Sequence, residues 1–148
     1  MKKSKAPGRK SMLNKPSLGL GDAQALVEYA RAYAAERGFP VSIVVVDITT
    51  YMQAAARMDR APLMSAEGAF DKARSAAEGG HPTTFFEKPL NEGRFSMVTM
   101  PHTPLEGGVP VFVDDQCVGA VGVAGAPPHV DAQIAEFAIA EFLRTLKG

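Results

Sequence analysis

The chain lacks the features of a disulfide-bonded or membrane protein. Its 148 residues include a single cysteine, Cys117, which excludes an internal disulfide and is typical of a protein in the reducing cytoplasm. Because Cys117 lies in an apolar, strand-like run, we expect a buried structural thiol. No apolar run is long enough to span a bilayer, and the first residues lack the apolar segment of a secretory signal. The sequence therefore predicts a cytoplasmic protein with no membrane partner.

Acidic residues are absent from the chain before Asp22. The 16 acidic and 16 basic side chains cancel, but six of the bases lie within residues 1–15. From residue 16 onward, 16 acids face 10 bases, a formal charge of −6. An acidic body excludes a nucleic-acid-binding domain, which would present a basic face. We expect residues 1–19 to form a disordered basic tail, with contact to an acidic surface as the alternative.

Strong catalytic motifs are also absent. There is no Gly-x-Ser-x-Gly, no phosphate-binding loop, and no histidine–cysteine cluster at zinc spacing. Glycines 119, 122 and 125 do not form the dinucleotide fingerprint, because that pattern needs a parallel βαβ unit and here it follows a hairpin. The residues therefore predict the architecture better than the chemistry.

The pattern of elements indicates an α+β fold with an antiparallel sheet flanked by helices in a single domain, residues 20–148. The composition, 46% hydrophobic and 22% charged, is that of a soluble globular protein. Asp22 is the expected N-cap of the first helix, and Pro89 is expected to end a short helix that begins after Pro82. The elements expected are a helix at 22–37, a hairpin of strands 41–47 and 51–57, a helix from about 62 or 65 to 78, a short helix at 82–88, a hairpin of strands 109–113 and 117–124 joined by 114–116, and a helix from 127 or 128 onward.

The stretch "CVGAVGVAGAPPHVD", residues 117–131, ends at a corner that has two readings. Gly125 permits close backbone approach, and the helix that starts near Pro128 presents free amide groups to an anion, with His129 beside it. Alternatively, the proline simply starts a helix and Asp131 favourably opposes the helix dipole. Glycines 107 and 108 likewise form either an anion-binding backbone nest or an ordinary turn.

Several side chains are candidates for ligand contact. Lys72 lies on a small-residue helix face, where it is either buried with an altered pKa, extended to solvent, or paired with a neighbouring acid on the same helix. His81 is a possible haem or metal ligand, as are His102 and His129, and each also suits a solvated loop. Phe85 and Phe86 suit a flat apolar ligand as well as an ordinary core.

In combination these segments resemble the GlcG/HbpS-like family, which includes the C-terminal domain of PduO-type proteins. The resemblance covers about Leu20 to Leu146, with Ile48-Thr49-Thr50 standing where relatives commonly have a glycine turn. It implies a profilin-like fold, a homo-oligomer and, for some members, haem binding and haem degradation. The motifs that carry it are Arg-Met-Asp at 57–59, Lys-Ala at 72–73, Pro-Thr at 82–83, Gly-Gly-Val-Pro at 107–110 and the run 119–131.

Three functions follow as hypotheses. The first is a protein that binds haem or a similar flat, anionic molecule, with His81 as axial candidate and the ligand lying between the sheet edge and residues 81–89. The second is a cofactor-free, isomerase- or lyase-like enzyme on an organic acid, with Lys72 or His129 moving a proton. The third is an oligomeric accessory subunit without turnover. The ligand-binding candidates are Arg57, Lys72, His81, Phe85, Gly107, Gly108, Gly125 and His129.

Overall fold

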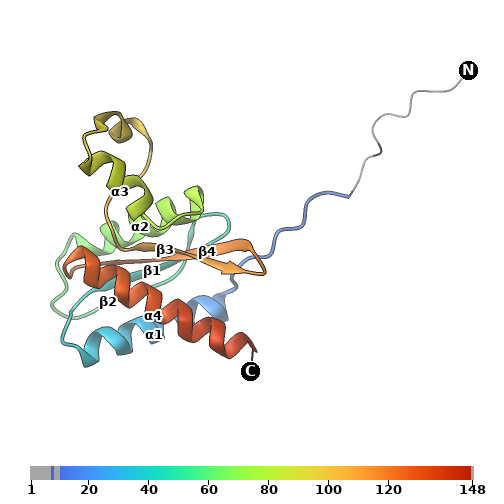
Figure 1. Ribbon diagram of the computed structural model, residues 1–148. Helices are drawn as coiled ribbons and strands as arrows, with labels where there is room; N and C mark the ends of the chain where they lie inside the picture. The colour runs from blue at the N-terminus through green and yellow to red at the C-terminus, as the bar shows by residue number, and fades with distance from the viewer. Residues whose placement is uncertain (1–7, 9–10, 148) are drawn as a thin grey trace, which may run out of the picture.

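The computed structural model describes residue 8 and residues 11–147, which form one four-stranded antiparallel sheet with helices on both faces (Figure 1). The order of strands in the sheet is β2-β1-β4-β3. The β1–β2 hairpin and the β3–β4 hairpin therefore join through the pairing of β1 with β4. This confirms the α+β prediction. The elements are α1 (Leu20–Glu36), β1 (Ser42–Asp47), β2 (Met52–Arg57), α2 (Ser65–Gly79), α3 (Thr84–Asn91), the 3-10 helix η1 (Phe95–Thr99), β3 (Gly108–Val113), β4 (Gln116–Ala124) and α4 (Pro128–Lys147).

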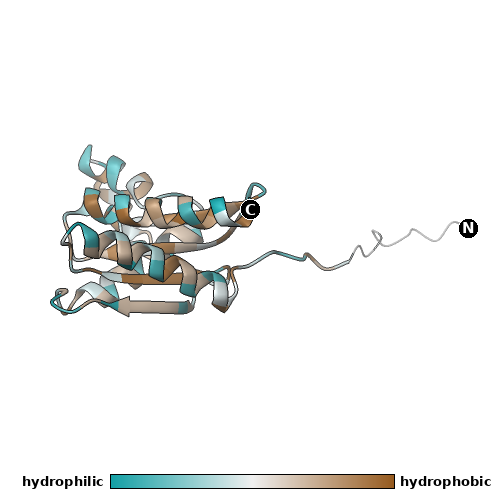
Figure 2. Ribbon diagram, turned by 90° about the horizontal axis from the view of Figure 1, so that it is seen from below, coloured by the Kyte–Doolittle hydropathy of each residue, from teal (hydrophilic) through white to brown (hydrophobic). Residues whose placement is uncertain are grey.

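The central strand β1 is buried on both faces, which explains its unbroken β-branched run. Ile43 and Val45 pack toward α1 and α4, whereas Val44 and Val46 pack toward α2. Figure 1 shows α1 and α4 side by side below the sheet and α2 above it, with α3 farther out. Seen from below, the strands are mostly brown and the helices carry the teal, hydrophilic positions (Figure 2). The sheet is therefore the apolar middle layer.

The contact between α2 and the sheet is made of very small side chains. A Cβ atom on Gly122 would overlap the carbonyl oxygen of Ala69, and one on Gly108 would overlap the carbonyl oxygen of Lys72. Backbone therefore packs directly on backbone, and no larger residue fits. The buried residues of this layer are Val44, Val46, Ala69, Ala73, Ala76, Ala120 and Ala124.

Three local predictions are corrected by the structure. α1 begins at Leu20, and Asp22, instead of capping it, lies inside its first turn and accepts the N–H of Gly19 at 2.9 Å.

Pro89 lies inside α3 instead of ending it. Proline removes only one helical N–H there, and the Arg94 N–H bonds to the Pro89 carbonyl beyond the helix end. The β3–β4 turn is Asp114-Asp115, both at positive φ (49° and 63°), because β4 already begins at Gln116.

The N-terminal segment joins the body before α1 begins. Leu18 is buried in the core and its N–H donates to the carbonyl of Val118 at 3.0 Å. Most of the basic residues of the segment 1–19 lie outside the described residues, so its disorder and the boundary at residue 20 stay predictions. Within the part of the chain that the structure describes, no helix is long and apolar enough to cross a membrane.

Candidate functional site

A buried ion pair links α2 to the start of α4. The side chains of Lys72 and Asp131 are 4% and 2% exposed, and Lys72 Nζ lies 3.0 Å from Asp131 Oδ2. The same ammonium donates to the carbonyl oxygen of Val123 at 3.0 Å. Charged groups are seldom this deeply buried unless they are paired. Lys72 is therefore buried, as one of the alternatives predicted, but its partner is Asp131 of α4 and not a neighbouring acid on α2.

The carboxylate of Asp131 also organises the corner at residues 125–128. Its Oδ1 accepts the N–H of Ala126 at 3.0 Å. The anion held at this corner is therefore the chain's own carboxylate, placed one turn into α4. The reading of Asp131 as a helix-dipole residue misses this role, because the sequence does not show that Lys72 lies opposite.

A cavity of about 290 Å³ opens beside this pair. We call it the Lys72 cavity. Its walls come from the segment before α2, from α2 itself, from the loop before β3, and from the corner that leads into α4. The lining residues are Pro62, Met64, Ser65, Gly68, Lys72, Thr103, Leu105, Ala124, Gly125, Ala126, Pro128 and Asp131. The site is thus a largely apolar hollow with one cation and one acid in its wall.

Glycines 107, 108 and 125 have structural reasons to lie around it. A Cβ atom on Gly107 would lie 2.7 Å from Lys72 Nζ and 2.6 Å from the Val123 carbonyl oxygen, so a side chain there would displace the ammonium. Gly107 and Gly125 also have φ of 133° and 120°, a region that disfavours side chains. Gly107 accepts the N–H of Val123 at 3.0 Å, which ties the glycine pair to β4. Gly107 and Gly108 therefore leave the space that the side chain and the backbone of Lys72 occupy.

Burial dominates the titration of Asp131. Loss of water raises the pKa of this carboxyl above its ordinary value, and the nearby Glu106 raises it further. The Lys72 charge, its hydrogen bond and the Ala126 N–H oppose this shift but do not cancel it. Asp131 therefore takes up a proton more readily than a solvated aspartate does.

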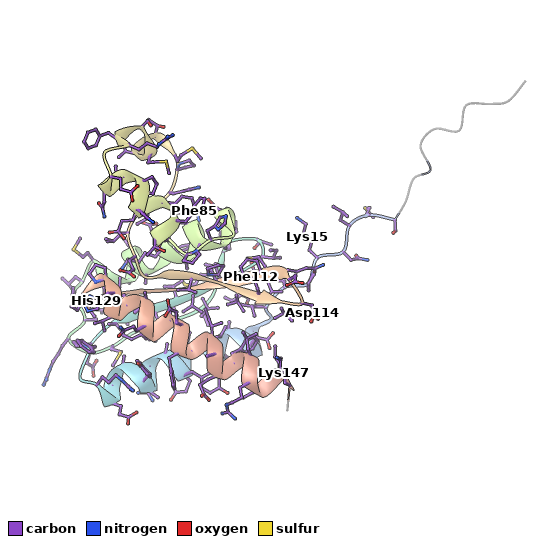
Figure 3. The ribbon with its side chains drawn as sticks, viewed as in Figure 1. Lys15, Phe85, Phe112, Asp114, His129 and Lys147 are labelled. Carbon is purple, nitrogen blue, oxygen red and sulfur yellow. The ribbon has the colours of Figure 1, made fainter. Side chains whose placement is uncertain are left out.

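The other predicted residues lie outside the cavity wall. His129 is exposed and follows the lining residue Pro128, and Arg57 is exposed at the end of β2. His81 lies past the far end of α2, roughly 13 Å along the helix axis from Lys72. It stacks on Phe85, with ring centroids 3.9 Å apart and Phe85 54% exposed. Figure 3 shows Phe85 and His129 at separate corners of the molecule.

A larger cleft of about 420 Å³ lies along a neighbouring face of α2 and shares Thr103 with the Lys72 cavity. Its lining is polar and includes Asp71, Glu78 and Arg74, and Arg74 already contacts Glu78 at 3.4 Å. Both charged side chains of that contact are partly exposed, so the charges are solvated. Within the described ranges 8 and 11–147, no group of three or more histidine, cysteine, aspartate or glutamate side chains could hold a metal ion. We therefore place the candidate site in the Lys72 cavity.

Comparison with known proteins agrees with the sequence resemblance. A family model described as "Haem degrading protein HbpS-like" matches residues 18–140. The chain belongs to the HbpS-like family. Protein GlcG of Escherichia coli K12 is 42% identical over 103 residues, which cover 69% of this chain and 77% of GlcG.

Solved structures of HbpS-like proteins share the whole fold. A crystal structure of an HbpS double mutant of Streptomyces reticuli superimposes with a TM-score of 0.80 at 30% identity, covering 88% of this chain and 90% of that one. A crystal structure of a PduOC–haem complex superimposes with a TM-score of 0.75 at 26% identity, covering 84% and 94%. The family prediction is confirmed.

Proposed function

We propose that this HbpS-like protein binds a small molecule through an acidic group, with haem or a similarly flat anionic molecule as the ligand, in the Lys72 cavity. One observation carries the proposal. Lys72 has three N–H donors, and the described residues occupy two of them, through Val123 and Asp131. A buried ammonium that lines a cavity has a third donor for a ligand oxygen, and unsatisfied buried donors are costly.

The residues fit one edge of a haem. A propionate would take the free donor of Lys72, and the porphyrin edge would lie against Pro62 and Leu105. The thioether of Met64 lines the cavity, and His129 directly follows the lining residue Pro128; both are residues of the types that ligate haem iron. The volume of about 290 Å³ is at the lower limit of ligand pockets, so the rest of a haem would extend past the rim. Bound haem would supply the redox chemistry of any degradation.

His81 supports a second placement of the same ligand. Its ring is parallel to that of Phe85 within 6°, and both side chains are exposed, which gives a flat surface beside residues 81–89. A haem ligated there would not contact Lys72. The two placements therefore predict different variants to fail.

The test is a titration of the purified protein with hemin, followed by the Soret band. We expect a saturable band at one hemin per subunit that shifts in Met64→Leu or His129→Ala and is unchanged in His81→Ala. A band lost only in His81→Ala would move the site to the His81–Phe85 surface. Absence of any saturable band would refute haem as the ligand. Loss of the band with a reductant and oxygen would extend the proposal to haem degradation.

The same pair also favours a second function, a cofactor-free enzyme on an organic acid. Lys72 and Asp131 place a buried proton donor and acceptor 3.0 Å apart in the wall of an apolar cavity, and His129 follows the lining residue Pro128. Exchange of solvent deuterium into a small carboxylic acid, followed by NMR, would reveal such a reaction. No exchange above the uncatalysed rate across a panel of acids would refute it.

We also propose a cytoplasmic homo-oligomer, either as the binding protein or as an accessory subunit. Large apolar side chains are exposed over residues 95–100 and elsewhere, with Leu63 85%, Phe95 75% and Val98 66% exposed, and a subunit interface would cover such residues. Light scattering coupled to size exclusion would give the subunit number. A monomer at micromolar concentration would refute this part of the proposal.

A further inference from the structure

We infer that the Lys72 cavity binds the carboxylate of its ligand together with one proton, which Asp131 carries. The inference rests on the proposed function, because it concerns how the same site accepts an acid. It adds the protonation state of the complex and the class of acid that the site prefers.

The charges around the pair are already balanced in the free protein. Lys72 is the cation and Asp131 the anion, and both are buried. Among the described residues, Glu106, in the segment before β3, is a further negative charge that acts on Asp131 and raises its pKa. A ligand carboxylate on Lys72 would therefore place two buried anions, with Glu106 near them, around one ammonium. Adjacent carboxylates in such a site cannot both stay ionised without a large cost, and they share a proton instead.

The contacts of Asp131 show which group takes the proton. Its Oδ1 already accepts the N–H of Ala126, an N–H that is present in both protonation states. Its Oδ2 depends on Lys72, the donor that an incoming carboxylate would share. Once Oδ2 is protonated it becomes a donor, and it can hydrogen-bond to an oxygen that an ionised aspartate would repel. The proton comes from solvent and is released again when the ligand leaves.

This balance defines the class of ligand. A single carboxylate on an apolar body matches one ammonium, one neutral acid and apolar walls. A phosphate monoester carries nearly two negative charges at neutral pH, for which the described wall offers one cation. The site should therefore select monocarboxylates over phosphate esters of the same size.

The experiment uses the intact protein and benzoate, a flat ring with one carboxylate. Calorimetric titrations at pH 7 in buffers of different ionisation enthalpy count the protons taken up on binding. We expect close to one proton per benzoate, and a Kd that rises about tenfold for each pH unit above neutrality, as one linked proton requires. Phenyl phosphate should bind at least tenfold more weakly.

Variants separate the inference from the proposed function. Asp131→Asn should abolish proton uptake and flatten the pH dependence, whereas Glu136→Gln, which changes an exposed acid on the same helix, should leave both unchanged. If Asp131→Asn fails to fold, the wild-type proton count decides the question by itself. Binding of benzoate without proton uptake would overturn the inference and keep the site. Failure of both benzoate and hemin to bind, or binding that Lys72→Met leaves intact, would overturn the proposed function as well.

Discussion

Removal of the Lys72 ammonium tests the buried pair most directly. In Lys72→Met the apolar stem remains, but Asp131 keeps a buried charge without its cation, and the Val123 carbonyl loses a donor. Breaking a buried ion pair on one side costs about 3–5 kcal/mol. Domains are stable by about 5–15 kcal/mol in total, so the loss is a large fraction. For a chain of this length it corresponds to a fall in Tm of roughly 6–20 °C.

The loss should depend on pH in a defined direction. Burial already raises the pKa of Asp131, and without Lys72 that pKa rises further. The folded variant then binds a proton that the unfolded chain releases, so its stability is greatest below the unfolded pKa and falls as pH rises through the folded pKa. The free energy of unfolding that Lys72→Met loses relative to the wild type should therefore be smaller at pH 5 than at pH 8.

Urea unfolding followed by circular dichroism at pH 5, 7 and 8 measures both effects. Lys88→Met, at an exposed lysine, is the matched control and should change stability by no more than about 0.5 kcal/mol. The double variant Lys72→Met/Asp131→Asn should regain most of the loss, because it leaves no unpaired charge. A cost below about 1 kcal/mol for Lys72→Met at pH 7, or a deficit that does not change with pH, would refute the reasoning.

Two further predictions concern packing. Gly122→Ala should lower the free energy of unfolding by about 1–3 kcal/mol, because its Cβ would overlap the Ala69 carbonyl. The control Gly21→Ala, which has open space in α1, should be neutral or stabilising. Equal effects of the two variants in urea unfolding would contradict the close packing. Phe86→Ala, which truncates a side chain only 6% exposed, should lower the free energy of unfolding by about 3–5 kcal/mol. Phe85→Ala, at a side chain 54% exposed, should cost much less. A lower melting temperature for Phe85→Ala than for Phe86→Ala would contradict the burial.

The sequence predicts the elements well because each depends on local patterns. The β-branched run at 41–47 and the alanine-rich helix ended by Gly38 carry their own signals. Pro89 misleads because proline usually ends a helix, and here α3 continues only two residues beyond it, to Asn91, at the loss of one helical hydrogen bond.

The candidate site could be predicted only in part. Lys72, Gly107 and Gly125 were recognisable as unusual, but the partner of Lys72 is 59 residues away and no local spacing relates the two. Asp131 has an ordinary explanation in the first turn of its helix, which conceals its second role. The sequence places His81 and Lys72 in one candidate site, but the second half of α2 separates them.

The backbone-on-backbone contact between α2 and the sheet has a consequence for how such a protein can diversify. A methyl group added to Gly107, Gly108 or Gly122 would meet a main-chain atom, so mutation has little freedom to reshape the packing around Lys72. The opposite wall is different, since Met64 and Leu105 project from irregular segments and are 80% and 40% exposed. New ligand preferences can therefore arise by exchanging rim side chains, while the charged base is inherited unchanged.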